Sequence, residues 1–237
     1  MIPETLDTTN QEWQELLTGE LLMFTLLGKM LLQIPEKSWL QPILDEELFS
    51  DVPFAEQQVD VIQGLALLTQ WSQQCEGIIT PQGLTDLKAD HTRLFTGLAN
   101  IPVAPWESVF FTEERLVFQK QTQDVRDWYQ GYGMTVVSGQ YKEPEDHIGL
   151  ELTFMAHLAK IGLAALAVQN QPEFEQALAA QRDFAQKHLF LWAPLWCSLI
   201  QEHAKSDFYR GLAQIVYGML LELAAILDVN IAEVVRS

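Results

Sequence analysis

Residues 143–155 read EPEDHIGLELTFM, the clearest helix signal in the sequence. It places Pro144 among three carboxylates, ahead of a long apolar run. Proline suits the first turn of a helix, and carboxylates are favoured beside the exposed N–H groups there. Apolar side chains then continue on two faces of the expected helix to about Val168. The stretch therefore predicts a central helix that starts near Glu143 and is buried on more than one side.

Helix signals recur on both sides of this stretch, whereas the alternation typical of strands is nearly absent. Thr9 and Glu12 have the spacing of a capping box, and Asn170 precedes Pro172 as a second helix start. The only run that reads as extended is 134–137. Further helices are expected at about residues 9–34, 54–75, 84–95, 122–129, 170 onward and 206–227. The sequence thus predicts an all-α protein, a helical bundle of about ten helices in two groups.

An irregular, glycine-containing segment separates the two expected groups of helices. Gly131, Gly133 and Gly139 lie in or beside it. We therefore predict an N-terminal helical group at 1–132, a hinge at 133–143 and a C-terminal helical group at 144–237, together forming one compact unit.

The charge balance points to cationic partners. The chain has 32 acidic and 14 basic side chains, for a net charge of -18, and its apolar fraction of 48% is enough for a sizeable core. A field of this sign repels nucleic acid and anionic membrane surfaces and attracts cations. Nucleic acid is therefore not an expected partner. The alternative is that the acidity only keeps the protein soluble.

Membrane insertion and export are both disfavoured. The apolar runs Leu16–Ile34 and Gly211–Val229 are interrupted by charged side chains, among them Glu222 in the second. A charge at mid-bilayer costs about 2.5–3.5 kcal/mol, so we expect core helices and no stable membrane insertion. The start of the chain lacks the pattern of a secretory signal. Cys75 and Cys197, the two cysteines, are far apart in the sequence. We expect both to be reduced thiols, as is usual in a cytoplasmic protein.

The cluster at residues 143–152 admits several chemical interpretations. His147 and Glu151 are one helical turn apart, the spacing of a metal site in a helical metal-dependent hydrolase, although helical dimetal sites normally use ligand pairs on two helices. Asp146 and His147 could form an acid/base dyad, but neighbouring helical residues diverge by about 100°. They could instead bind a cationic peptide. The simplest alternative is that these charges only stabilise a helix start.

A second cluster, residues 104–111, reads APWESVFF. Trp106 beside Glu107 in a proline-stiffened loop is an efficient binding feature, because a rigid aromatic side chain buries much area at little entropic cost. The alternative is a tryptophan that fills the core beneath a loop. The sequence contains neither a phosphate-binding loop nor a GxSxG motif. No catalytic residue, metal or cofactor is therefore expected.

In this order, the two clusters resemble the TorD/DmsD family of redox-enzyme maturation chaperones. Trp106-Glu107-Ser108-Val109 and Glu143-Pro144-Glu145-Asp146-His147-Ile148-Gly149 are the most specific parts of the resemblance. The other matching segments are 91–97, 188–192 and 208–213.

The resemblance implies an all-α cytoplasmic chaperone that is not an enzyme. Such proteins bind the twin-arginine signal peptide of a molybdenum-cofactor reductase precursor, of the trimethylamine N-oxide or dimethyl sulfoxide type, and delay its export until the cofactor is inserted. It also implies a monomer or a dimer that swaps domains at the hinge, and it leaves the client reductase open. The implied peptide-binding residues are Trp106, Glu107, Asp146 and His147, with Leu94 and Phe95 lining an adjacent groove. Of these, Glu107 and Asp146 suit bidentate pairing with arginine.

Overall fold

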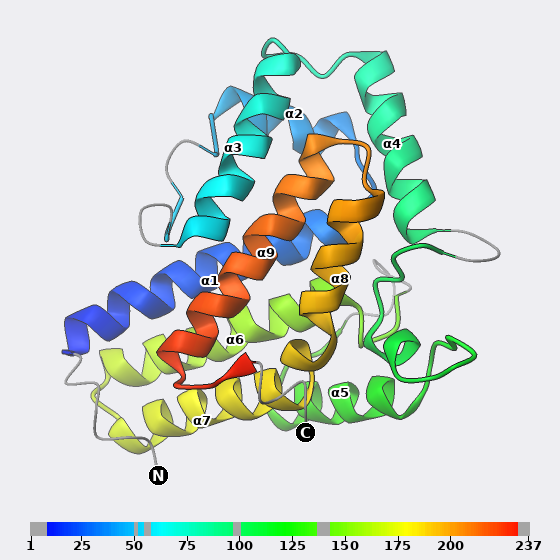
Figure 1. Ribbon diagram of the computed structural model, residues 1–237. Coiled ribbons are helices and arrows are strands. Elements are labelled where there is room, and N and C mark those ends of the chain that lie inside the picture. The colour runs from blue at the N-terminus through cyan, green and yellow to red at the C-terminus, as the bar shows by residue number, and fades with distance from the viewer. Residues whose placement is uncertain (1–8, 50–51, 55–57, 97–100, 137–142, 232–237) are drawn as a thin grey trace. The chain divides into compact units, whose positions relative to one another are not determined.

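The computed structural model describes residues 9–49, 52–54, 58–96, 101–136 and 143–231 (Figure 1). Within these ranges the protein is all-α, as predicted, and contains no strand beyond one isolated β-bridge. The helices are α1 (Asn10–Leu32), α2 (Lys37–Asp45), α3 (Val59–Gln74), α4 (Pro81–Phe95), the 3-10 helix η1 (Glu107–Phe110), α5 (Lys120–Gly131), α6 (Ile148–Ala167), α7 (Gln171–Lys187), α8 (Leu189–His203) and α9 (Asp207–Ile226).

Two compact units make up the chain, and neither is continuous in sequence. Unit 1 comprises residues 1–32, 106–192 and 221–237, and unit 2 comprises residues 33–105 and 193–220. Helices α8 and α9 each begin in one unit and end in the other. The segment 133–143 that we predict as a hinge falls within the middle part of unit 1, and residues 137–142 of it lie outside the described residues.

Helix α6 is the centre of unit 1, as its apolar faces predict. It packs against α1 and α7, and α1 and α6 run side by side in Figure 1. The α1–α6 crossing is close because Gly28 and Gly149 meet there: a Cβ on Gly149 would lie 2.7 Å from the carbonyl oxygen of Gly28. Phe154 on α6 meets Tyr129 of α5 at 4.8 Å and Phe184 of α7 at 4.7 Å between ring centroids.

By length and composition alone, α6 could also cross a membrane, the one such helix among the described residues. Its 18-residue apolar window is 56% buried inside the protein. Burial of this kind is what a core helix of a folded domain shows.

Unit 2 is organised around a cluster of aromatic rings. Phe208 at the start of α9 lies 4.7 Å from Trp71 of α3, and the adjacent Tyr209 lies 5.4 Å from Phe95 of α4. Phe95 also stacks on Trp196 of α8 at 6.2 Å. Phe95 is therefore part of the core of unit 2.

The helix caps follow the sequence signals closely at several places. Thr9 and Glu12 form the predicted capping box, with the Thr9 N–H donating to Glu12 Oε2 at 2.6 Å. Asn170 caps α7, where its side chain accepts from the N–H of Glu173. Helices α2 and α8 were not predicted, because each contains an internal proline, Pro42 or Pro194.

One expectation about the start of a helix is wrong. Helix α6 begins at Ile148, so residues 143–146 precede it instead of forming its first turn. The run predicted as extended belongs to no strand at 134–136, and its last residue lies outside the described part of the chain.

Candidate functional site

The two clusters singled out in the sequence meet in unit 1. Trp106 and His147 form an isolated antiparallel β-bridge. The N–H of Glu107 donates to the backbone carbonyl of Asp146 at 2.9 Å. Segments that lie about 40 residues apart in sequence are thereby fixed side by side by their backbones, and four of the six predicted site residues are brought together.

Asp146 is the residue that ties this junction together. Its side chain is fully buried and accepts from the N–H of Ser108 at 2.8 Å and from the hydroxyl of Thr122 at 2.9 Å. These bonds connect the segment before α6 to η1 and to α5. The carboxylate therefore does not cap the N–H groups of α6, because it accepts hydrogen bonds from η1 and α5 instead.

The glutamates on either side of Asp146 also have partners. Glu143 Oε2 accepts from the indole Nε1–H of Trp106 at 3.1 Å. Arg126 donates two hydrogen bonds to the carboxylate of Glu145, of 2.8 Å from Nε and 2.9 Å from Nη2. This bidentate contact lowers the pKa of Glu145, whereas burial raises the pKa of Glu143. The whole segment is thus held in one conformation by charge-assisted hydrogen bonds.

His147 is the N-cap of α6. Its Nδ1 accepts from the N–H of Gly149 at 3.0 Å, which requires that Nδ1 carries no proton. The indole of Trp106 lies edge-on to the imidazole, at 6.3 Å between centroids. Trp106 is the only one of the six predicted site residues that is partly exposed; the others are buried.

Glu107 points inward to a buried histidine. Its side chain is 1% exposed, and its Oε2 lies 2.9 Å from Nδ1 of His188 at the junction of α7 and α8. Burial is the main influence on Glu107 and raises its pKa, and the contact with His188 opposes that shift. A buried carboxyl of this kind is stabilised only while it keeps its partner.

A third carboxyl group, Glu151 on α6, completes this buried cluster. It accepts from the indole N–H of Trp192 at 3.3 Å and is fully buried. Burial, followed by the charges of Glu107 and Asp146, raises the pKa of Glu151 well above its usual value.

The geometry does not favour the alternative of a metal-dependent hydrolase. His147 and Glu151 are each engaged in the contacts given above. Among the described residues, no group of three or more His, Cys, Asp or Glu side chains is arranged to hold a metal ion.

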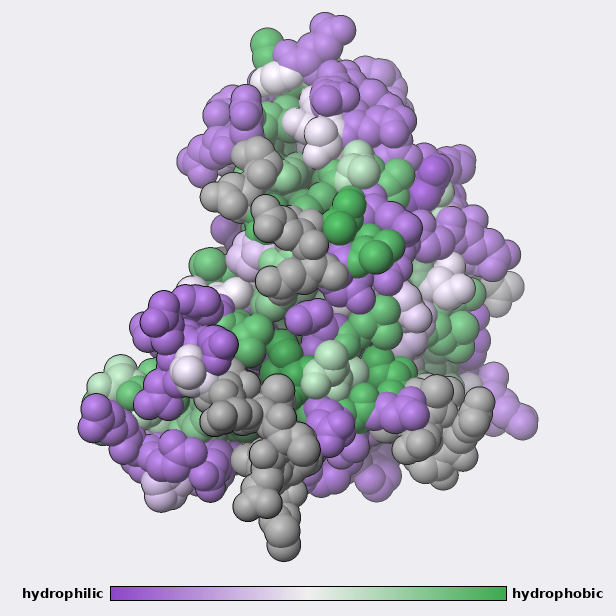
Figure 2. Space-filling model, turned by 60° about the vertical axis from the view of Figure 1, so that its left-hand side comes forward, coloured by the Kyte–Doolittle hydropathy of each residue, from purple (hydrophilic) through white to green (hydrophobic). Residues whose placement is uncertain are grey.

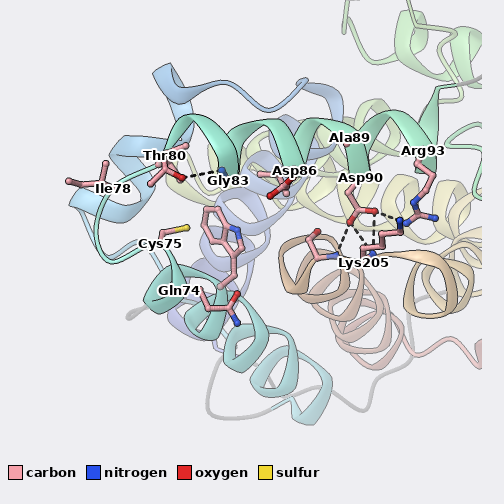
Figure 3. Close-up of a pocket in the computed structure, with 14 residues that line it drawn as sticks. Gln74, Cys75, Ile78, Thr80, Gly83, Asp86, Ala89, Asp90, Arg93 and Lys205 are labelled. Atoms are coloured by element: carbon pink, nitrogen blue, oxygen red, sulfur yellow. Dashed lines mark hydrogen bonds and ion pairs between the residues drawn. The ribbon is translucent and has the colours of Figure 1, made fainter.

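Leu94 and Phe95, the remaining predicted site residues, belong to unit 2. Leu94 is fully buried and Phe95 is 4% exposed, so both face the core. Another face of the same helix α4 borders a cavity of about 600 Å³ (Figure 3). Its lining includes Trp71, Cys75, Ile79 and Leu87, with the charged side chains Asp86, Asp90, Arg93 and Lys205 among them.

Asp90 closes one end of this cavity. It is 4% exposed and accepts from the N–H groups of Lys205 and Ser206, at 3.1 and 2.8 Å, and from Arg93. Figure 3 shows Asp90 and Arg93 side by side, away from the apolar end near Ile78. The cavity can accommodate apolar groups at one end and polar groups at the other.

Sequence reasoning missed the partners that hold the site. His188 and Trp192 stand only in a loosely matching segment, Thr122 only at the start of an expected helix, and no sequence signal singles out Arg126. They lie between 19 and 81 residues from the carboxyl groups they contact, on α5, on α8 or between α7 and α8. No local pattern carries that information.

Comparison with known proteins places the chain in a family. The model described as nitrate reductase delta subunit matches residues 61–198. Chaperone protein TorD from Aliivibrio salmonicida is 32% identical over 139 residues, which are 57% of this chain and 61% of that protein. Tat proofreading chaperone DmsD from Salmonella typhi is 34% identical over 140 residues, 59% of this chain and 61% of that protein.

Chaperone protein TorD from Vibrio cholerae (strain O395) is 29% identical over 148 residues, 62% of this chain and 65% of that protein. The chain therefore spans somewhat less than two thirds of the length of these relatives. Since the family model covers more than half of the 237 residues and the relatives carry these names, the protein belongs to the TorD/DmsD family.

Proposed function

We propose that this protein is a cytoplasmic chaperone, not an enzyme, that binds the twin-arginine signal peptide of a reductase precursor. The client in this proposal is a molybdenum-cofactor reductase of the trimethylamine N-oxide or dimethyl sulfoxide type. Binding delays export of the precursor until its cofactor is inserted. The chaperone itself needs no cofactor and acts as a monomer or as a dimer that swaps domains at residues 133–143.

One observation carries the proposal: the backbone bridge between Trp106 and His147, which joins the two segments that resemble the family. The relatives are named as chaperones, and DmsD is named as a Tat proofreading chaperone. A net charge of -18 favours a partner with clustered cations.

The proposed peptide-binding residues are Leu94, Phe95, Trp106, Glu107, Asp146 and His147. Trp106 offers the exposed aromatic surface of this set, and Glu107 and Asp146 offer carboxylates that suit guanidinium groups. Since both carboxylates are bonded internally, an arginine reaches them only by exchanging with a present partner.

Titration calorimetry against synthetic signal peptides from molybdoenzyme precursors tests the proposal. We expect one peptide to bind tightly and its Lys-Lys variant to bind at least tenfold more weakly, because an ammonium group lacks the planar fork that pairs with carboxylate. If no signal peptide binds the folded protein, the proposal is overturned.

A further inference from the structure

His188 separates an open cavity on unit 1 from the buried carboxyl cluster. The cavity has a volume of about 930 Å³, and His188 is part of its lining. On the inner side, the same imidazole contacts Glu107 at 2.9 Å. The same side chain thus lines a surface cavity and contacts the buried carboxyl group of Glu107.

The cavity contains an aromatic face that already carries a cation. Trp128 and Tyr132 stack with their planes 10° apart and their centroids at 5.9 Å. The ammonium group of Lys187 lies over the Trp128 ring at 5.4 Å from its centroid. Asp124 and Asp127 line the same cavity from α5, and Lys120, also in the lining, pairs with Asp124. An aromatic face flanked by carboxylates is the environment in which a cationic side chain binds.

Buried oxygen atoms near Glu107 have unused capacity to accept hydrogen bonds. Oγ of Ser108 is buried and has no hydrogen-bond partner among the described residues, and Oε1 of Glu151 has none apart from its contact with Glu107. Among the described residues, the ion-pair contact of Glu107 is with the imidazole of His188, at 2.9 Å. A buried polar atom without a partner is costly, so a ligand with several N–H donors gains more here than on the surface.

We infer that this cavity is the site where a peptide arginine enters: its guanidinium stacks on Trp128 in place of Lys187 and takes over Glu107 from His188. The inference rests on the proposed function and assigns one subsite of it. Arginine suits the exchange because its planar group stacks on an aromatic ring and also pairs with a carboxylate. His188 is then a positioning residue that closes the cluster while no peptide is bound.

Apolar side chains in the cavity lining and in the loop that follows Phe111 fit the rest of such a peptide. Phe111, which lines the cavity, is 45% exposed, and Leu116 and Phe118 in the loop that follows it are 51% and 65% exposed. On the face drawn in Figure 2, hydrophobic residues interrupt the hydrophilic surface in several places. Exposed apolar side chains close to a cation site suit a segment in which arginines precede apolar residues.

Lys187→Gln gives the first test, since the side chain is 58% exposed and its replacement should leave the fold intact. Removing the resident cation should raise affinity for the twin-arginine peptide about threefold to fivefold, a gain of about 0.7–1 kcal/mol. The control is Lys160→Gln, which removes one charge from an exposed position of α6 and should change affinity less than twofold. In a Trp128→Leu background, Lys187→Gln should no longer change the affinity, because the indole ring for which Lys187 and the peptide arginine compete is absent.

The second readout is the ¹⁵N signal of the His188 imidazole, identified by comparison with His188→Gln. We expect it to move when the twin-arginine peptide is added and to stay in place with the Lys-Lys peptide. Suppose instead that the peptide binds, yet Lys187→Gln behaves like Lys160→Gln and the His188 signal does not move: then this inference falls and the proposed function stands. If the wild-type protein binds no signal peptide, both fall together.

Discussion

Glu20 on α1 and Gln181 on α7 form a buried pair, in which the Gln181 amide donates to Glu20 Oε2 at 2.8 Å. Each side chain is 1% exposed. Burial raises the pKa of Glu20 to about 7, and the charge of the nearby Glu222 adds to the shift. Glu20 is therefore protonated in the folded protein over a pH range in which it ionises in the unfolded chain.

The pH dependence of stability follows from this shift. A carboxyl group whose pKa is higher in the folded state loses stability as pH rises, here between about 4.5 and 7. A shift of this size corresponds to about 3 kcal/mol. Glu20→Gln should match the wild type at pH 4.5 and exceed its free energy of unfolding at pH 8, measured by urea titration. The exposed Glu15→Gln on the same helix is the control; if the Glu20→Gln and wild-type curves run parallel, the pair does not titrate as described.

Gly149→Ala should destabilise unit 1. The added Cβ would lie 2.6 Å from Cγ of Leu32 and 2.7 Å from the carbonyl oxygen of Gly28, so α1 and α6 must move apart. Overpacking of this kind costs about 1–3 kcal/mol. Gly131→Ala is the matched control, because no atom lies within 4 Å of its added Cβ. Thermal unfolding followed by circular dichroism compares the two, and an equal midpoint for both variants would contradict the close crossing.

Asp146→Ala and His147→Ala should both weaken binding of the signal peptide, but with different effects on stability. Loss of the Asp146 carboxylate leaves the Ser108 N–H and the Thr122 hydroxyl without their acceptor, at about 1–3 kcal/mol for a buried donor. Loss of the His147 cap costs about 1 kcal/mol. Calorimetry measures the peptide affinity of each variant, and thermal unfolding of the same samples measures its stability. Wild-type affinity in a folded variant would remove that residue from the site.

The two thiols should differ in reactivity. Cys197 is 3% exposed and Cys75 is partly exposed beside the cavity of unit 2. Burial raises the pKa of both thiols, and it does so far more for Cys197. A native thiol titration should therefore count one cysteine, faster at higher pH, and two in denaturant. Cys75→Ser should abolish the native reaction; a persisting signal would mean that Cys197 is accessible.

Many helix boundaries can be predicted from the sequence because helix capping depends on residues close together in the chain. The cap at Asn170 and the capping box at Thr9 depend on residues three apart. The start of α6 was misplaced for the opposite reason. Pro144 and its neighbours look like a helix start, but Asp146 is held by Ser108 and Thr122, 38 and 24 residues away.

The candidate site divides in the same way. The motif segments around Trp106 and His147 were identifiable by resemblance, and the structure joins them. The buried contacts of Glu107 and Glu151 were not predictable, because their partners are His188, between α7 and α8, and Trp192 of α8, which are distant in sequence. The grouping of Leu94 and Phe95 with that site remains a prediction.

The interrupted sequence of the two units constrains how the chain folds during synthesis. Helix α1 ends at Leu32, and its partner α6 begins at Ile148, so more than 100 residues are translated between them. At a translation rate of about 5–20 residues per second, on the order of ten seconds pass between the synthesis of α1 and the synthesis of the helix that covers it, α6. Its apolar face, which includes Phe24 and Leu27, is exposed during that interval. A protein whose relatives are named as chaperones thus emerges with a hydrophobic helix that must itself be kept from aggregating until its partner arrives.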